Sequence, residues 1–336
     1  MKFIFIIFLL SLTWVSAEVK IIERQDKSLK ISYEMDVQGN FYLSKKELSP
    51  SNIKNKTINF SENVKLGKYT EWIEDAIPLT SHKLEGSLFI ENLLPNQQYY
   101  LYEVNDSSTN LVLKFKSLQI APKKAPGSIV FNNKKTSSLN FKWKKGLGQG
   151  TIIVVSKDSQ PELPKDGIVY RSGKYGDKDA DIGKKSYVVY SGKRIKRSSF
   201  EIGDLDYGQY FVAVLDYNGV GEYRNYSEIN LNGGLRSTWT LLPPPKNLKV
   251  KAVDVDVAYI IWEAVENVKH YEIEVATDTK FENLLEDYNK SDIGDLPEFA
   301  IVVDDTQLEY YWRLRCVGKG GPSEWSDTKI LNYGKK

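Results

Sequence analysis

The stretch Tyr310-Tyr311-Trp312-Arg313-Leu314-Arg315-Cys316 decides the fold class. Every second side chain in it is apolar or aromatic, and two of the side chains between them are arginines. Successive side chains of a β-strand point to opposite faces of the sheet, so this alternation predicts a strand with one face in a hydrophobic core. The predicted inner face consists of Trp312, Leu314 and Cys316, and the outer face carries Arg313 and Arg315.

Strands that open with a tyrosine in the same way occur twice earlier in the chain, at Tyr99 and Tyr210. Each of the three is preceded by an alternating stretch that ends in an aromatic residue: Tyr33, Trp143 and Trp262. These aromatic positions are 110 and 119 residues apart, which is the length of one β-sandwich domain each time. Helical periodicity is absent over long windows, and turn-forming residues recur at short spacing. The sequence therefore predicts an all-β chain of three consecutive immunoglobulin-like β-sandwiches.

This threefold pattern resembles the fibronectin type III domain. The resemblance implies that Tyr33, Trp143 and Trp262 pack in the centres of the three sandwiches. It also implies that the later tyrosine, at Tyr99, Tyr210 and Tyr310, forms a tyrosine corner whose hydroxyl bonds to upstream backbone. The approach Leu93-x-Pro95-x-x-x-Tyr99 matches the family pattern. The approach is one residue shorter in the second repeat and irregular in the third, over residues 303–310.

The second repeat is longer than the third. The distance from the central aromatic residue to the corner tyrosine is 48 residues in the third repeat but 66 and 67 in the first and second. In the second repeat, Pro164-x-Asp166-Gly167-x-x-Tyr170 and Tyr187-Val188-Val189-Tyr190-x-Gly192 belong to this longer region. They resemble an elaborated fibronectin-like module of large secreted and surface-attached bacterial proteins. That resemblance implies an interaction module and no particular reaction.

The N-terminal residues predict export. An uncharged apolar run over residues 3–15 follows Lys2, and Val15-Ser16-Ala17 supplies the small residues that signal peptidase accepts. We therefore expect a signal peptide over residues 1–17, cleaved before Glu18. The run is too short to span a bilayer comfortably, and no later stretch is apolar enough to do so. We expect an extracellular or cell-surface protein with no transmembrane span, divided into domains over residues 18–121, 122–235 and 240–336.

The composition argues against several function classes. The chain has 46 basic and 44 acidic residues, whereas a nucleic-acid-binding protein shows a basic excess or stripe. Its two histidines, His82 and His270, have no acidic or cysteine companions at ligand spacing, which does not favour a zinc site or a catalytic triad. Cys316 is the only cysteine, so no internal disulfide can form. We expect no cofactor, no catalytic residues and no nucleic-acid partner.

Two polar motifs remain as weak site candidates. The alternating aspartates Asp177, Asp179 and Asp181 are the type of residue that binds calcium. However, a glycine falls one place late for an EF-hand loop and Val188 stands where that loop has glutamate. The resemblance makes this segment a hairpin connection, and we expect no metal there. The run Lys193-Arg194-x-Lys196-Arg197 is either a solvated turn or a contact for an anionic polymer.

Trp325 is a candidate for a structural clasp. Its segment, Ser323-Glu324-Trp325-Ser326, resembles half of the tryptophan-serine box of cytokine-receptor domains, in which the indole stacks between arginines of a neighbouring strand. The resemblance implies that Trp325 stacks on Arg313 and Arg315, and such cation–π contacts contribute about 0.5–2 kcal/mol. The alternative is that Trp325 forms part of a ligand platform.

These observations favour a secreted or cell-surface interaction or structural protein that adheres, spaces or assembles through tandem β-sandwiches. The partner is an extracellular protein or glycan, or a second copy of the chain. The main alternative is an extracellular carbohydrate-binding accessory protein, which would present two or three coplanar exposed aromatic rings. A hydrolase is the third possibility. Fold alone does not distinguish these classes.

Overall fold

The computed structural model describes residues 18–35, 40–45, 47, 84–90, 93–104, 109–229, 233–304 and 309–333. The predicted signal peptide and His82 lie outside these residues. The described part of the chain forms 22 strands and two 3-10 helices of three residues each, which confirms the predicted all-β class. In that part no helix is long and apolar enough to cross a membrane. The chain divides into two compact units, the first containing residues up to Lys123 together with 164–169 and 217–227.

The first unit contains two three-stranded antiparallel sheets. One sheet has the order β1 (Glu18–Arg24), β2 (Leu29–Met35), β4 (Leu84–Ile90), and the other has the order β3 (Asn40–Ser44), β5 (Gln98–Val104), β6 (Thr109–Lys116). Their buried side chains form one hydrophobic cluster. Tyr33 is 8% exposed and packs edge-on against Phe41, with ring centroids 5.1 Å apart. The Tyr99 hydroxyl accepts a hydrogen bond of 2.7 Å from the backbone N–H of Leu94, which is the geometry of a tyrosine corner.

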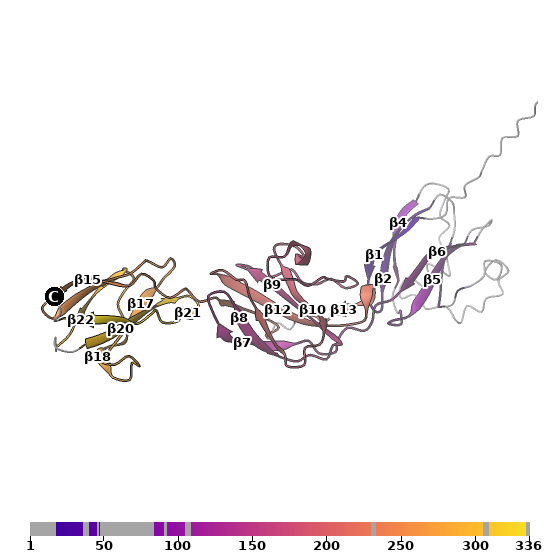
Figure 1. Ribbon diagram of the computed structural model, residues 1–336. Helices are drawn as coiled ribbons and strands as arrows, with labels where there is room; N and C mark the ends of the chain where they lie inside the picture. Colours follow the sequence, from indigo (N-terminus) through magenta and orange to yellow (C-terminus); the bar gives the residue numbers. More distant parts are fainter. Residues whose placement is uncertain are drawn as a thin grey trace, which may run out of the picture. The chain divides into compact units, whose positions relative to one another are not determined.

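The second pair of sheets begins at β7 (Figure 1), and most of its residues belong to the second unit. One sheet has the order β11 (Ser199–Ile202), β8 (Leu139–Lys144), β7 (Gly127–Lys134). The other has the order β10 (Tyr187–Lys193), β9 (Gly150–Lys157), β12 (Gln209–Asn218), β13 (Asn225–Tyr226), with β14 (Leu235–Trp239) also paired to β12. Alternate residues of β8, which are Leu139, Phe141 and Trp143, are buried in the shared core. The period-2 pattern of the sequence thus sets the inner face of this strand.

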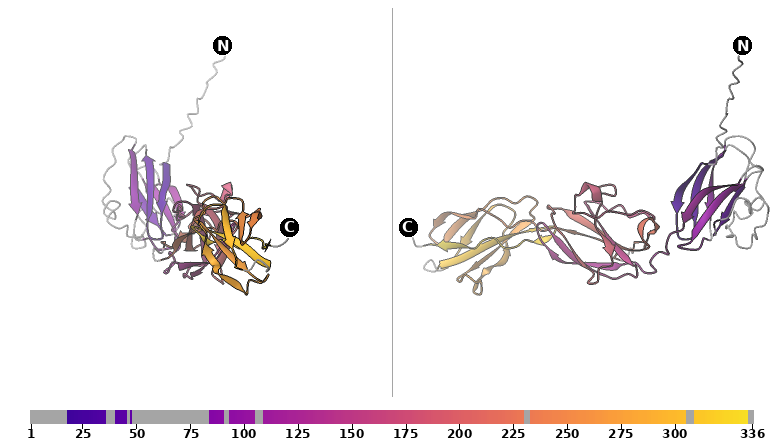
Figure 2. Two further views of the ribbon diagram at one scale, coloured as in Figure 1. Left: turned by 90° about the vertical axis from the view of Figure 1, so that its left-hand side faces the viewer. Right: turned by 45° about the vertical axis from the view of Figure 1, so that its right-hand side comes forward.

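The third pair of sheets contains the alternating stretch from Tyr310 to Cys316. One sheet has the order β15 (Lys249–Asp254), β16 (Val257–Ile261), β19 (Glu298–Val302). The other has the order β18 (Leu284–Asp292), β17 (His270–Ala276), β20 (Glu309–Gly318), β21 (Gly321–Pro322), with β22 (Lys329–Asn332) also paired to β20. These strands are the orange and yellow ones in Figure 2. All three pairs of sheets share one plan. In each pair the first two strands and one later strand, which is β4, β11 or β19, form one sheet, and the other described strands form the second sheet.

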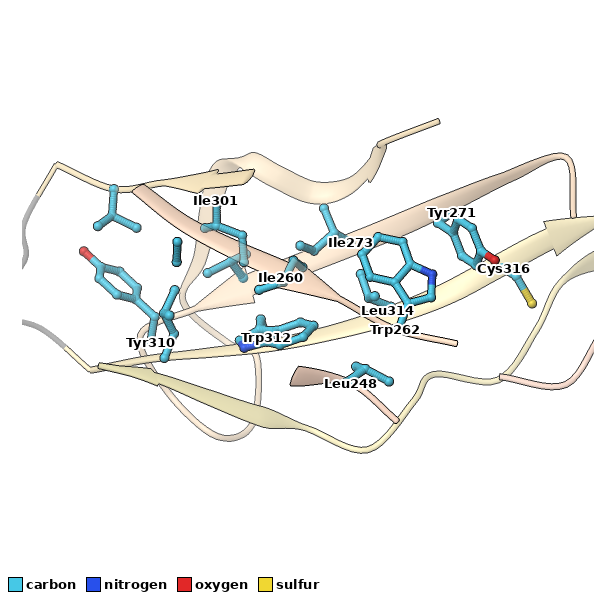
Figure 3. Packing of buried hydrophobic residues seen from close by; sticks show 14 of the residues in the cluster. Leu248, Ile260, Trp262, Tyr271, Ile273, Ile301, Tyr310, Trp312, Leu314 and Cys316 are labelled. Atoms are coloured by element: carbon cyan, nitrogen blue, oxygen red, sulfur yellow. The ribbon is translucent and has the colours of Figure 1, made fainter. Parts of the chain in front are cut away.

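The core of the third sandwich has the predicted inner face of β20. Trp312, Leu314 and Cys316 are each 0% exposed, and Figure 3 shows them along one side of their strand. Trp262 is 6% exposed and packs edge-on against Tyr271, with ring centroids 5.0 Å apart. The alternation in sequence is therefore a reliable guide to burial here.

The tyrosine hydroxyls differ between the repeats. Tyr210 is 0% exposed, and its hydroxyl donates a hydrogen bond of 2.5 Å to the Asp206 carboxylate. Burial, together with that carboxylate, raises the pKa of Tyr210 above its usual value. In the third repeat Tyr310 is 2% exposed and packs edge-on against Tyr333, and part of its predicted approach, residues 305–308, lies outside the described residues. There the Tyr271 hydroxyl, on β17, accepts a bond of 2.9 Å from the N–H of Val265.

Candidate functional site

Opposite charges face each other on the outer side of β17 and β20. In the antiparallel register, Glu274 lies opposite Arg313 and Glu272 lies opposite Arg315. Because the inner-face residues of both strands are buried, these four side chains share the outer face of the sheet. Opposite-charge pairs directly across two strands stabilise a sheet. The register therefore places two ion pairs side by side.

Both arginines bind their carboxylates closely and also contact aromatic rings. Arg313 donates from Nε and Nη2 to one oxygen of Glu274, at 2.8 and 2.6 Å, and Arg315 Nε donates to Glu272 at 2.6 Å. The guanidinium carbon of Arg315 lies 4.4 Å from the Trp325 ring centroid, and that of Arg313 lies 4.8 Å from it. The guanidinium carbon of Arg313 also lies 3.9 Å from the centroid of Phe281. We call these six residues the arginine ladder: Phe281, Arg313, Trp325, Arg315, Glu272 and Glu274.

Two serines hold Trp325 in place. The backbone N–H groups of Ser323 and Ser326 donate to the carbonyls of Cys316 and Leu314 at 2.8 and 2.7 Å. In return the Ser323 and Ser326 hydroxyls accept from the N–H groups of Cys316 and Leu314 at 3.1 and 3.0 Å. Backbone and side-chain hydrogen bonds therefore hold the segment around Trp325 against β20. Each charge in the ladder has a partner within the ladder, which favours the clasp over a ligand platform.

The sequence indicated Trp325, Arg313 and Arg315 but missed the other members of the ladder. Glu272 and Glu274 alternate with buried residues on β17, as the arginines do on β20. That matching alternation of opposite charges was the available signal. Phe281 follows β17, is 8% exposed and has a positive φ of 60°, and nothing in its sequence context predicts that it reaches Arg313.

The three candidate calcium aspartates have separate structural tasks. Asp177 accepts from the N–H of Asp179 at 3.0 Å and so caps a 3-10 helix over Lys178–Ala180. Asp179 pairs with Arg171 at 2.6 Å, and Asp181 accepts from the N–H of Gly183 at 2.8 Å. Within the described ranges, no group of three or more His, Cys, Asp or Glu side chains could hold a metal ion. The observed contacts give each carboxylate a partner within its own segment.

Removal of divalent cations is expected to leave the melting temperature of the second sandwich unchanged within about 1 °C, because these aspartates already have protein partners. Differential scanning calorimetry with excess EDTA, and again with added CaCl₂, measures this directly. Asp181→Asn serves as a control, because it removes a carboxylate that calcium would need but keeps an acceptor for the Gly183 N–H. Its melting temperature should therefore equal that of wild type with and without calcium. A fall of several degrees with EDTA that calcium reverses would contradict the expectation.

Cys316 is expected to react slowly with thiol reagents in the native protein. Its side chain is 0% exposed, and the sulfur lies 2.9 Å from the carbonyl oxygen of Pro243. Burial raises the pKa of the thiol, so the reactive thiolate is scarce at neutral pH. Labelling with an aromatic disulfide should proceed at the rate at which the third sandwich opens, and should become immediate in denaturant. Rapid native labelling would mean that the inner face of β20 is misassigned.

Comparison with known proteins finds similar solved structures, and three of them are given below. No family model matches the chain, and no curated protein matches it. The FN1–FN3 domains of chicken CNTN1 are 12% identical, with a TM-score of 0.34, over 94% of this chain and 97% of that one. A two-domain fibronectin type III segment of chicken tenascin is 13% identical, with a TM-score of 0.34, over 62% and 99%. An Fn3-like protein from Clostridium thermocellum is 18% identical, with a TM-score of 0.25, over 29% and 98%. The assignment of a tandem fibronectin type III-like fold to this chain rests on the repeated strand pairing described above.

Proposed function

We propose that this chain is an exported, non-enzymatic interaction or structural protein whose tandem β-sandwiches act as binding or spacing modules outside the cell. The observation that carries the proposal is the repetition of one strand plan three times, each time around its own hydrophobic cluster. Three copies of one module favour a role in which surfaces, rather than a single catalytic cleft, perform the function. In this proposal residues 18–121, 122–235 and 240–336 each fold as a module.

The charged and hydroxyl-bearing side chains that the sequence singled out make structural contacts. The arginine ladder and the aspartates of residues 177–181 are joined to partners in their own segments, as described above. Tyr99 and Tyr210 use their hydroxyls to fix the turns that precede their strands. These contacts stabilise the modules, and recognition is left to the exposed surface.

The carbohydrate-binding alternative would need either exposed aromatic rings or a charged surface. Among the described residues, the large exposed hydrophobic side chains include one aromatic, Tyr259, at 47% exposure. A row of coplanar rings is therefore not the feature that favours glycan binding. A concentration of positive charge on the second sandwich is a better basis for it.

The test is to follow the protein in the cell that produces it. We expect the mature N-terminus to be Glu18 and the protein to be accessible to protease added to intact cells. Immobilised mature protein should retain an envelope component saturably, and thermally unfolded protein should not. An Ala17→Leu variant, in which cleavage is blocked, provides the control for export. Unprocessed protein confined to the cytoplasm, or turnover of a substrate by purified protein, would overturn the proposal.

A further inference from the structure

Eight exposed basic side chains gather at one end of the second sandwich. They come from the segment before β7, from β8 and the loop that follows it, and from the end of β10 and its turn into β11. We call this group the basic end: Lys124, Lys142, Lys144, Lys145, Lys193, Arg194, Lys196 and Arg197. All eight belong to the second compact unit.

Backbone contacts bring these segments together. The loop after β8 is joined to the segment before β7, because the Leu147 N–H donates to the Lys124 carbonyl at 2.9 Å. The same loop is joined to the turn after β10, because the Arg194 N–H donates to the Gln149 carbonyl at 3.3 Å. At the start of β11, the Trp143 N–H donates to Ser198 at 3.0 Å. Segments more than 40 residues apart in sequence thus place their cations on adjoining loops.

The positive charge of the basic end is not offset by neighbouring carboxylates in sequence. No Asp or Glu occurs within residues 124–157 or 182–200, although the whole chain is nearly neutral. In the part of the chain that the structure describes, none of the eight side chains forms an ion pair. The buried Asp216 lies near one of the eight, Arg194, and offsets at most one of the charges. Like charges held together in this way produce a local field that attracts anions.

A buried carboxylate holds the loop after β8 in a fixed position. Asp216 is 0% exposed and accepts hydrogen bonds from the Gly148 N–H at 3.1 Å and the Thr151 hydroxyl at 2.8 Å. A Cβ at Gly146 would lie 2.4 Å from Asp216 Oδ2 and 2.6 Å from the Lys124 carbonyl oxygen, so only glycine fits. Burial raises the pKa of Asp216, and the hydrogen bonds and the nearby Arg194 oppose that rise. A loop fixed in this way loses little conformational entropy when a ligand binds.

We propose that the basic end is a binding site for a linear anionic polysaccharide, whose carboxylate or sulfate groups face these eight cations. The cations lie along several loops and one strand face, which matches a string of charges on a polymer better than a single small anion. Single-stranded nucleic acid would use exposed aromatic rings for stacking, whereas the aromatic among the large exposed hydrophobic side chains of the described residues, Tyr259, belongs to β16 of the third sandwich. This inference rests on the proposed role as an extracellular interaction protein and names its ligand class.

The experiment compares two sets of four glutamine substitutions in the full mature chain. K193Q/R194Q/K196Q/R197Q removes half of the basic end. K174Q/K178Q/K184Q/K185Q removes the same charge from the other end of the sandwich. The ends are distinct because Lys193 pairs with Gly150 and Tyr187 pairs with Val155 at opposite ends of β10, and a seven-residue strand spans about 20 Å.

Binding is measured with dextran sulfate and polygalacturonate, with neutral dextran as the blank. Wild-type protein is expected to bind at least one of the two anionic polymers and to lose affinity steeply as NaCl is raised. The first variant should bind about 100-fold more weakly, and the second should stay within about threefold of wild type. The two anionic polymers distinguish sulfate from carboxylate as the recognised group. Because Arg194 lies near Asp216, K144Q/K145Q/K196Q/R197Q is the second test variant and should also lose most of its affinity.

Several results would overturn the site. These are equal losses in the two charge-matched variants, binding of neutral dextran, or tighter binding of single-stranded DNA than of either polysaccharide. Salt-sensitive self-association that the first variant abolishes, without polymer binding, would assign the basic end to a second copy of the chain instead. Polymer binding by a protein that proves to be cytoplasmic would support the site and contradict the proposed extracellular role, so the two failures are distinguishable.

Discussion

Replacing Trp262 with alanine is expected to lower the free energy of unfolding of the third sandwich by about 3–5 kcal/mol. The indole lies in the cluster shared by both sheets of this sandwich and packs edge-on against Tyr271. Its Nε1 has no hydrogen-bond partner among the residues that the structure describes, so the loss comes from packing and from the cavity left behind. Calorimetry of the mature chain should show the transition of the third sandwich moved to a much lower temperature.

The control is Tyr259→Ala, three residues earlier and on the outer face of β16, the strand that ends just before Trp262. Its side chain is 47% exposed, so its removal should cost less than about 1 kcal/mol. The transition of the first sandwich should not move in either variant, because its buried cluster shares no residue with this one and belongs to the other compact unit. Equal losses for the two variants, or a shift of all transitions together, would contradict the separate core.

The fold could be predicted because its signal is local. Alternation along β8, β16 and β20 specifies which face of each strand is buried, whatever the partner strand, and the inner-face tryptophans are buried as that pattern requires. The bond between the Tyr271 hydroxyl and the N–H of Val265 was not predicted, because the repeated pattern marks only the later tyrosine of each repeat. The corner at Tyr310 stays a prediction, because part of its approach lies outside the described residues.

The sites depended on features that sequence spacing does not specify. The ladder needs the register that pairs Glu274 with Arg313, and a shift by one residue would turn these side chains to the other face. Asp216 follows Leu215 in a buried strand, and only the fold of the loop after β8 gives its carboxylate hydrogen-bond donors. The cations of the basic end are visible in the sequence, but their proximity depends on contacts between distant loops.

Replacing Arg313 with alanine is expected to lower the free energy of unfolding of the third sandwich by about 3–5 kcal/mol, as for breaking a buried ion pair. The Glu274 side chain is only 3% exposed, whereas that of Arg313 is 26% exposed. Removing the arginine therefore leaves a largely buried carboxylate without the cation that pairs with it. It also removes the contacts of the guanidinium with the rings of Phe281 and Trp325.

The reverse change should cost less, and this asymmetry is the sharper test. Glu274→Ala leaves a guanidinium that reaches water and keeps both aromatic contacts, so we expect a loss of about 1–2 kcal/mol. The double variant should lose less than the sum of the single losses, because residues in contact are coupled. Chemical denaturation of the three variants measures this. A smaller loss for Arg313→Ala than for Glu274→Ala would contradict the buried pair.

Trp325→Ala separates the clasp from the ligand platform within the same ladder. As a clasp, the indole covers the guanidinium groups of Arg313 and Arg315, so its removal should lower the melting temperature of the third sandwich alone. Retention of envelope components by the variant should then equal that of wild type at a temperature where both are folded. Arg315→Ala should reproduce part of the same destabilisation. Lost retention with an unchanged melting temperature would show that Trp325 faces a ligand, and the arginines would then be the groups that orient it.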